Sequence, residues 1–340
     1  MSGLDPAARR RFPRRDVAVS QLGCGMLPFG SAAPSDTDAT LGAAFDAMHA
    51  RGLRYFDTAP MYGTGLSEHR VGACLRRVDR RGVVLSTKVG RLLDPVGGGA
   101  AAGASDGRYP FEIRFDYGYD GTMRSIEHSL QRLGTNAIDI ALIHDVNRRW
   151  QGELVDQRYA EAMDGAHRAL VELRAAGAIR AFGVGVNDWS ILMRFAADGD
   201  FDCFMLAGRY TLLDHSALDT FLPDCERRGI AVLMAAPFNS GILATGATPG
   251  ATFFYQPAEA GIVERTRRIE AVCARHGVAL AAAALQFPLG HPAVASVVTG
   301  MRSAAEVDAN LAHIAAPVPK AFWDELKNEG LIAPHAPAPR

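Results

Sequence analysis

Short apolar runs alternate with helical patterns along almost the whole chain, and this alternation constrains the fold more than any other feature. Strands that are apolar throughout, each followed by a helix, indicate a parallel sheet that is buried on both faces. Eight such units within about 300 residues suit a closed (β/α)8 TIM barrel of the α/β class better than an open sheet. The predicted strands span 20–26, 54–59, 83–89, 138–143, 180–186, 201–206, 230–236 and 294–300. The predicted helices span 36–50, 67–78, 121–133, 159–176, 189–197, 215–228, 261–276, 279–287 and 303–313, with Ser67 as the N-cap of the second.

Two long segments interrupt this rhythm, residues 91–119 and residues 239–260. Both follow predicted strand ends, where a barrel places the loops of its active site. The Gly/Ala-rich run within the first segment lacks the Lys-Ser/Thr ending of a phosphate-binding loop, so we interpret it as flexible. We therefore expect one barrel domain over residues 1–340, with long loops at its C-terminal mouth and a disordered leader at residues 1–15.

Composition argues against several classes of function. Lys and Arg total 36 and Asp and Glu total 37, for a formal net charge of −1, so a nucleic-acid or membrane-surface partner is not expected. The dense basic run at residues 9–15 is interpreted as part of the solvated leader, because it has no interleaved aromatic residues beyond Phe12.

Cysteine usage and the N-terminus bear on the compartment. The five cysteines are scattered and never in CxxC spacing, which indicates a reducing compartment and no zinc or other metal site. The N-terminus has no apolar segment typical of a signal peptide. The longest apolar stretch, residues 277–298, is interrupted by Gln286, Pro288 and His291, which favours a buried helix and strand over a membrane span. We expect a cytoplasmic protein.

Four polar residues lie at or just after the ends of predicted strands. Asp57 ends "RYFD", Tyr62 follows it in the loop, Lys88 ends "VVLSTK" and His144 ends "IDIALIH". Carboxyl ends of barrel strands meet at one mouth, and buried charges need partners, so we expect Asp57 to pair with Lys88. The Lys88 ammonium would then lower the pKa of Tyr62 from about 10 and make it a general acid or base, with His144 orienting the substrate oxygen. Each residue taken alone is more often a cap or a satisfied polar group; the combination at three successive units favours catalysis.

These residues and their surroundings resemble the aldo-keto reductases. The resemblance rests on "YFDTAPMYGTGLSEHRVGACL", "LSTKVG", "RSIEHSLQRLGTNAIDIALIH" and "AFGVGVNDW", and extends from about Ser20 to Leu311. It implies the same barrel, a catalytic tetrad of Asp57, Tyr62, Lys88 and His144, and a nicotinamide dinucleotide bound without a Rossmann GxGxxG sequence. "FDYGYDGTMRSIEHSLQRLG", "MLAGRYTLLD" and "PFNSGILATG" are similar to the D-threo-aldose 1-dehydrogenase group, which includes L-fucose, D-arabinose and L-galactose dehydrogenases and is related to pyridoxal 4-dehydrogenase. That group oxidises the hemiacetal carbon of a cyclic sugar, or of an analogous hemiacetal, to a lactone.

The resemblance also implies a set of cofactor contacts. Asn187 fits a polar pair that holds the nicotinamide carboxamide, whereas Ala207 and Ala235 stand where many relatives have a Gln and a stacking aromatic ring. Glu306 stands where NADP-specific relatives have a basic residue, and its carboxylate would repel a 2′-phosphate, so NAD is expected. Arg302 is nonetheless able to bind a phosphate, which leaves NADP as the alternative. The remaining predicted contacts are Pro237, Asn239, Gly241, Leu243, Gly300 and Asn310.

The function that we expect is oxidation of an aldose of the L-fucose, D-arabinose or L-galactose type at C1, with Trp150 and Arg209 as candidates to line the sugar pocket. The alternatives are an NADPH-dependent aldehyde or ketone reductase and a pyridoxal 4-dehydrogenase, because the same four residues serve either direction. A non-catalytic binding barrel or a metal-dependent hydrolase is less consistent with the residues. The partner expected is a small-molecule substrate; the sequence does not predict the oligomeric state.

Overall fold

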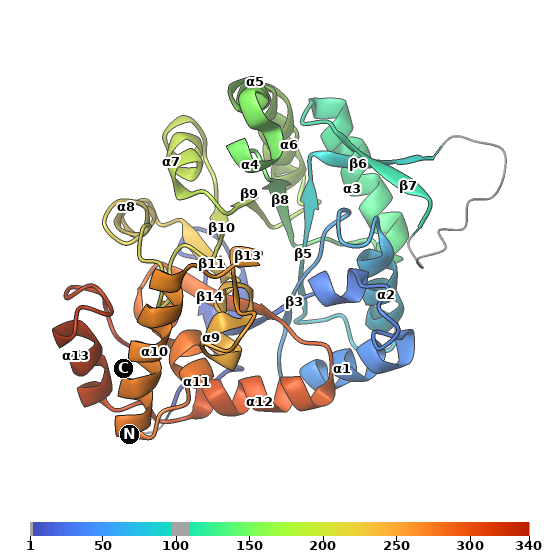
Figure 1. Cartoon of the computed structure of the whole chain (residues 1–340). Coiled ribbons are helices and arrows are strands. Elements are labelled where there is room, and N and C mark those ends of the chain that lie inside the picture. Colours follow the sequence, from blue (N-terminus) through green and yellow to red (C-terminus); the bar gives the residue numbers. More distant parts are fainter. Residues whose placement is uncertain (1–2, 97–108, 340) are drawn as a thin grey trace.

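Eight parallel strands form a closed barrel in the computed structural model, which describes residues 3–96 and 109–339 (Figure 1). Neighbouring strands follow chain order, and the last, β14, closes the barrel by pairing with β3. The barrel strands are β3 (Leu22–Gly25), β4 (Tyr55–Asp57), β5 (Val84–Val89), β8 (Ile140–His144), β9 (Ala181–Val186), β10 (Cys203–Ala207), β11 (Ala231–Ala235) and β14 (Val294–Gly300). The predicted (β/α)8 barrel is confirmed.

Helices surround the barrel, and the main core lies between the two layers (Figure 1). They are α1 (Asp38–Ala50), α2 (Leu66–Leu75), α3 (Tyr119–Leu133), α4 (Arg148–Gln151), α5 (Val155–Glu161), α6 (Arg168–Ala175), α7 (Trp189–Asp198), α8 (Phe221–Arg228), α9 (Ile242–Thr245), α10 (Ala260–His276), α11 (Leu280–Gln286), α12 (Ala304–Ala315) and α13 (Lys320–Asn328). Helices α4, α9 and α13 were not predicted. Within the described residues, no single helix is long and apolar enough to cross a membrane, although the bent pair formed by α10 and the segment that begins with α11 passes the same test together.

Two predicted helix details were wrong for identifiable reasons. Helix α2 is preceded by Gly65 with a left-handed φ of 97°, and Ser67 lies inside the helix, where its hydroxyl donates to the Met26 carbonyl at 2.7 Å instead of capping. The single helix expected over 159–176 is divided by a π-helical segment, η3 (Ala162–His167). There Gly165 packs against the backbone of Gly118, where a Cβ atom would lie 2.6 Å from the Gly118 Cα.

The leader predicted to be disordered is ordered from residue 3 onward. Strand β1 (Arg9–Arg11) pairs antiparallel with β2 (Ala18–Ser20). Phe12 is only 2% exposed and belongs to the core that fills the barrel interior. The basic run is not simply solvated, because the Arg10 guanidinium donates to the carbonyls of Val294 and Leu289 at 2.7 and 3.0 Å. This hairpin covers the end of the barrel opposite the mouth.

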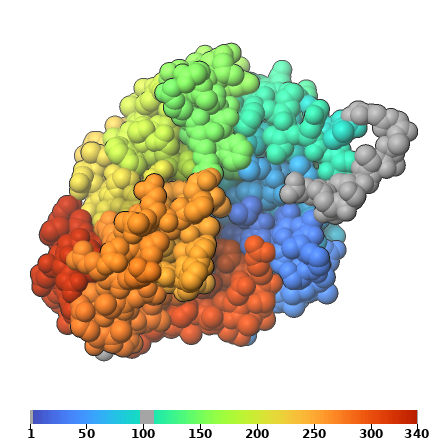
Figure 2. Space-filling model, viewed as in Figure 1, coloured from blue at the N-terminus to red at the C-terminus, as the bar shows by residue number. Residues whose placement is uncertain are grey.

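Both long loops contain secondary structure. The first holds an antiparallel hairpin of β6 (Arg91–Pro95) and β7 (Phe111–Phe115), while its Gly/Ala-rich part, residues 97–108, lies outside the described residues. The second contains η4 (Asn239–Gly241), α9 and a hairpin of β12 (Thr252–Phe253) and β13 (Gln256–Pro257). In Figure 2 this second segment, in orange, reaches across the face of the molecule toward the green segment near residue 150.

Candidate active site

The barrel brings the four predicted catalytic residues together at its mouth. Asp57 is the last residue of β4, Lys88 lies near the end of β5, and His144 ends β8. These three strands are direct neighbours, so their C-terminal ends converge, and the loop after β4 adds Tyr62. Asp57 and Lys88 are each 2% exposed and His144 is 7% exposed.

Lys88 and Asp57 form a buried ion pair with satisfied partners. The Lys88 Nζ donates to Asp57 Oδ2 at 2.6 Å and to the Thr58 carbonyl at 2.9 Å. The Ser86 hydroxyl donates to the other carboxylate oxygen at 2.6 Å. Burial acts to lower the pKa of Lys88, but Asp57 and then Tyr62 raise it above its ordinary value on balance. Lys88 therefore remains a cation inside the site.

Tyr62 lies against this cation. The Lys88 Nζ is 4.8 Å from the centroid of the Tyr62 ring. Burial raises the pKa of Tyr62 and Lys88 opposes this effect, but the pKa stays above its ordinary value. The expectation of a lowered pKa was therefore wrong in sign, because the loss of hydration outweighs the nearby ammonium. The expected direction of the Lys88 contribution alone is confirmed.

His144 lies edge-on to Tyr62, with 6.2 Å between the ring centroids. Burial, followed by the charges of Arg91 and Lys88, lowers the pKa of His144 well below its ordinary value. The imidazole is consequently neutral and has one N–H to donate and one nitrogen lone pair. The site thus combines a fixed cation, a phenol and a neutral imidazole, which is suited to moving a proton at a substrate oxygen.

A second buried ion pair lies beside His144, and sequence reasoning missed it. Arg91, the first residue of β6, is 2% exposed and donates to Asp145 Oδ2 at 2.8 Å. Its guanidinium stacks near the rings of Phe115 and Trp150, at 5.1 and 4.7 Å from their centroids. The available signal was the sequence "KVGR", which puts an arginine three residues after the predicted lysine.

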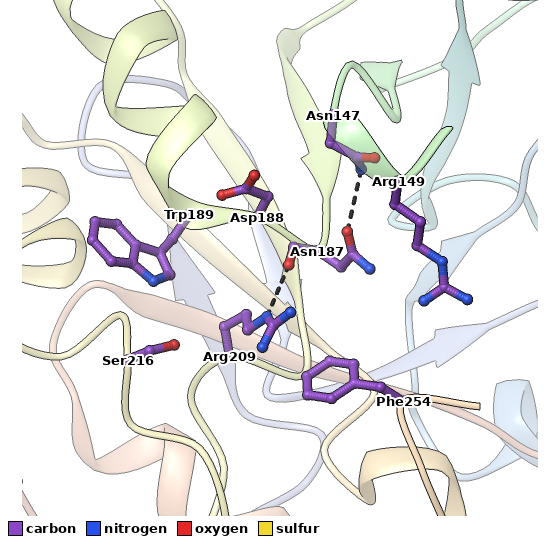
Figure 3. Close-up of a pocket in the computed structure, with 8 residues that line it drawn as sticks. All are labelled: Asn147, Arg149, Asn187, Asp188, Trp189, Arg209, Ser216 and Phe254. Carbon is purple, nitrogen blue, oxygen red and sulfur yellow. Dashed lines mark hydrogen bonds between the residues drawn. The ribbon is translucent and has the colours of Figure 1, made fainter. Parts of the chain in front are cut away.

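A cavity of about 430 Å³ opens beside the tetrad, between the loops that follow β8, β9, β10 and β11 (Figure 3). Asn187 lies at its centre: its side-chain oxygen accepts from Asn147 at 3.2 Å, and its carbonyl accepts from the Arg209 Nε at 2.9 Å. None of the tetrad residues lines this cavity. Asn147, which does, donates from its side-chain nitrogen to Asp145 Oδ1 at 3.5 Å, and Asp145 follows His144 in the chain. The lining residues are Asn147, Arg149, Asn187, Asp188, Trp189, Arg209, Ser216 and Phe254.

Two aromatic residues close one side of this region in a strained turn. Phe254 and Tyr255 connect β12 to β13 with φ values of 48° and 63°, a left-handed conformation that bulky residues rarely adopt. The Arg209 guanidinium lies 4.0 Å from the Phe254 ring centroid, and Arg149 lies 5.4 Å from that of Tyr255. Such strain is typical of residues held in place for a functional contact.

Four predicted cofactor contacts follow β11: Pro237, Asn239, Gly241 and Leu243. The Asn239 side chain is already engaged, because it accepts from Thr211 Oγ1 at 2.5 Å and donates to the Gly208 carbonyl at 3.2 Å. Pro237 and Leu243 are buried. Left-handed φ values occur at Asn239, Ser240 and Gly241. The backbone N–H groups of Asn239 and Gly241 already donate to the carbonyls of Ala236 and Phe238, at 3.1 and 2.9 Å. A cofactor phosphate at this turn would therefore have to be bound by its other backbone groups.

The contacts predicted after β14 lie at the start of α12. Arg302 is exposed, but its guanidinium donates to Asp36 Oδ2 at 2.5 Å. Glu306 is exposed and accepts from the Arg302 backbone N–H at 2.9 Å. Gly300 is exposed at the strand end, and Asn310 is 8% exposed on α12. Because β11 and β14 are neighbouring strands, the two groups of predicted contacts adjoin each other, whereas Asn187 lies two strands away.

Both the sequence and the fold are similar to those of known proteins. Residues 21–329 match the Aldo/keto reductase family. The chain is 41% identical to the pyridoxal 4-dehydrogenase of Microbacterium luteolum, covering 97% of this chain and 99% of that protein. It is 36% identical to the D-threo-aldose 1-dehydrogenase of a Pseudomonas species, covering 98% and 99%. The solved holo form of the aldo-keto reductase AKR11C1 from Bacillus halodurans has the same fold, with a TM-score of 0.74 at 23% identity over 95% of each chain.

Proposed function

This chain belongs to the Aldo/keto reductase family of oxidoreductases, and from that premise we propose that it oxidises the C1 hemiacetal of an aldose to a lactone. The observation that carries the proposal is the Tyr62 phenol, held against the buried Lys88–Asp57 pair and facing a neutral His144. L-Fucose, D-arabinose and L-galactose are the proposed class of sugar. A single catalytic barrel domain in the cytoplasm completes the proposal, and the five unpaired, buried cysteines support a reducing compartment.

Each residue of the tetrad has a defined task in this reaction. When bound, the nicotinamide cofactor supplies the hydride acceptor. Tyr62, as the phenolate, accepts the proton of the C1 hydroxyl. Lys88 stabilises the phenolate by its charge, and Asp57 keeps Lys88 protonated and in place. His144 donates a hydrogen bond to the reacting oxygen and so fixes its position.

Cofactor preference follows from the charges after β14. We propose NAD, because Glu306 places a carboxylate beside the expected ribose site and Arg302 is already paired with Asp36. The Glu306 carboxylate would repel a 2′-phosphate, and Arg302, which is held by Asp36, would not be free to bind it. Asn187, the backbone around Asn239 and Gly241, and the residues from Gly300 to Asn310 are the proposed cofactor contacts.

Pyridoxal is the second candidate substrate. The 41% identity to a pyridoxal 4-dehydrogenase, over nearly the full length of both chains, favours it. Aromatic rings near the site, those of Trp150 and Phe115 beside Arg91, would also suit an aromatic substrate. The polar cavity with Asn147 and Ser216 is in turn suited to sugar hydroxyls.

Initial rates with NAD and NADP test the proposal on a panel of L-fucose, D-arabinose, L-galactose and pyridoxal, together with simple aldehydes in the reductive direction. Reduction of NAD by one of the sugars, with a higher kcat/KM than for pyridoxal, supports the aldose proposal. A preference for pyridoxal replaces the substrate but keeps the hemiacetal chemistry. Activity only on aldehydes with NADPH contradicts both the oxidation and the NAD proposals.

A further inference from the structure

The buried Arg91–Asp145 pair touches both nitrogens of the His144 ring. The Arg91 Nη1 lies 3.5 Å from His144 Nδ1, and Asp145 Oδ2 lies 3.4 Å from His144 Nε2. The same Asp145 oxygen accepts from the Arg91 Nη2 at 2.8 Å. Three charged or polar side chains from β6 and the end of β8 therefore form one contiguous cluster beside Tyr62.

The pair is built into the fold at several points. Gly90 precedes Arg91 with a φ of 96°, and a Cβ atom there would lie 2.2 Å from the Tyr117 ring. Tyr117 in turn donates its hydroxyl to the His144 carbonyl at 2.7 Å. Asp145 has a left-handed φ of 56°, and Gln151 donates to its carbonyl at 3.1 Å. The backbone of His144 and Asp145 is thus fixed independently of the two charges.

The chemistry of the two partners selects one form of the histidine. A guanidinium has only N–H donors, so the nitrogen that faces it, Nδ1, must present its lone pair. An ionised carboxylate has only acceptors, so the nitrogen that faces it, Nε2, must carry the hydrogen. A neutral imidazole satisfies both neighbours with a single tautomer, the one protonated at Nε2.

Burying this ion pair costs free energy. Both charges lose their hydration, and their mutual attraction compensates for that loss only with good geometry. Apolar residues of similar volume often give a protein that is just as stable. Here Asp145 is the only carboxylate within ion-pair distance of Arg91 in the described part of the chain. Conformational specificity at a neighbouring group is one reason for retaining such a pair.

We propose that Arg91 and Asp145 are positioning residues that hold neutral His144 as the Nε2–H tautomer. The Asp145 oxygen lies 3.4 Å from Nε2 and forms no hydrogen bond with it, so this N–H can still donate to the substrate oxygen. The inference rests on the oxidoreductase function proposed above for the use of that donor, but not for the tautomer itself. Arg91 and Lys88 are the cations, Asp145 and Asp57 the carboxylates, and Tyr62 the phenol that surround His144.

The tautomer can be read directly by ¹⁵N NMR of histidine-labelled full-length protein without substrate, with the His144 signals assigned by their loss in His144→Gln. We expect the wild type to show a neutral ring with Nε2–H from about pH 5 to 9, a range in which an ordinary histidine becomes charged. In the double variant Arg91→Met/Asp145→Asn, we expect mixed tautomers and protonation at a higher pH than in the wild type, because the neighbouring cation is gone.

Kinetics provide the second readout. We expect kcat of the double variant to fall about 10- to 100-fold with KM nearly unchanged, a part of the about 10²–10⁴ that a positioned proton donor contributes. Arg91→Lys keeps the charge without the forked donor and should fall between the double variant and the wild type. The control, Arg174→Met/Asp202→Asn, removes a partly buried pair joined at 2.7 Å that lies at the opposite end of the barrel, and should leave the His144 spectrum and kcat unchanged.

Two results would overturn the proposal: a wild-type His144 protonated at Nδ1, or a folded double variant with wild-type tautomer and kcat. If the double variant does not fold, Asp145→Asn alone tests the acceptor side by the same spectrum. Because the spectrum needs no substrate, its result separates the two proposals. The expected tautomer with no oxidation of any sugar or pyridoxal would contradict the proposed function and leave the positioning role supported.

Discussion

At the scale of single residues, the site depends on charges that were placed in the barrel mouth at an energetic cost. Lys88 and Asp57 are each 2% exposed and have only each other as counter-charge within ion-pair distance in the described chain. Neither residue is needed to fill the core, since apolar side chains of similar volume would serve. We propose that their role is to hold a cation against Tyr62.

We therefore expect that removing both charges of the pair restores stability that the single variant loses, but does not restore activity. Lys88→Met leaves Asp57 buried without a cation, and we expect the free energy of unfolding to fall by about 3–5 kcal/mol. Lys88→Met/Asp57→Leu removes both charges and should recover most of that loss while remaining inactive. Urea unfolding of the three proteins, with rates measured in parallel, checks this. Recovery of activity together with stability would refute the assigned role of Lys88.

The raised pKa of Tyr62 predicts how the rate depends on pH. Oxidation needs the phenolate, so kcat for oxidation should increase with pH through the alkaline range and level off only above the raised pKa. Reduction needs the phenol, so its kcat should be flat at neutral pH and decrease at the same alkaline values. Because the pKa of His144 is lowered, we expect no further change in kcat near pH 6.5, where an ordinary histidine titrates. A profile that levels off below pH 7 in the oxidative direction would show that Tyr62 is not the base.

At the scale of elements, the alternation of strands and helices predicted the barrel because each βα unit repeats the same pattern locally. The tetrad could be predicted for the same reason, since strand ends must meet at one mouth. The Arg91–Asp145 pair could not, because it joins residues 54 apart whose contact depends on the hairpin β6–β7. The division of the helix at η3 was equally hidden, since it depends on the close approach of Gly165 to Gly118.

The hairpin β1–β2 was not predicted, because five arginines dominate this segment and only a few of its residues are buried. Phe12 closes the barrel interior at the end opposite the mouth, where Val17 and Val19 are also fully buried. Phe12→Ala should lower the free energy of unfolding by about 3–5 kcal/mol through the cavity that it creates, with kcat and KM unchanged. Chemical denaturation measures this, and Leu154→Ala, at a position that is 52% exposed, is the control, expected within about 0.5 kcal/mol of the wild type. An equally small effect at Phe12 would mean that the hairpin does not contribute to the core.

At the scale of the whole molecule, the proposed cofactor path crosses the mouth from Asn187, after β9, to Glu306, on α12. The tetrad lies on β4, β5 and β8 and in the loop after β4, on the other side of that mouth. Only β3 separates β14 from β4, but Arg302 and Glu306 contact each other and Asp36 and not the tetrad, so we expect changes at one site to leave the other intact.

Because the tetrad and the expected adenosine site share no residue, we expect that the preference for NAD over NADP can be altered without a loss of kcat. Asp36→Asn frees Arg302, and Glu306→Gln removes the facing carboxylate, so the double variant should raise kcat/KM for NADP about 10-fold or more, as expected for one added charge-assisted hydrogen bond. The kcat with NAD should change little. Steady-state rates with both cofactors check this, and an unchanged ratio would place the adenosine ribose elsewhere.

The proposed removal of the substrate hydroxyl proton by Tyr62 is tested most directly by kcat of Tyr62→Phe. We expect the rate of oxidation by this variant to fall by about 10²–10⁴-fold, while NADH binding, followed by its fluorescence, and thermal stability stay close to those of the wild type. A folded Tyr62→Phe protein that oxidises the same substrate at the wild-type rate would contradict the assignment of the site.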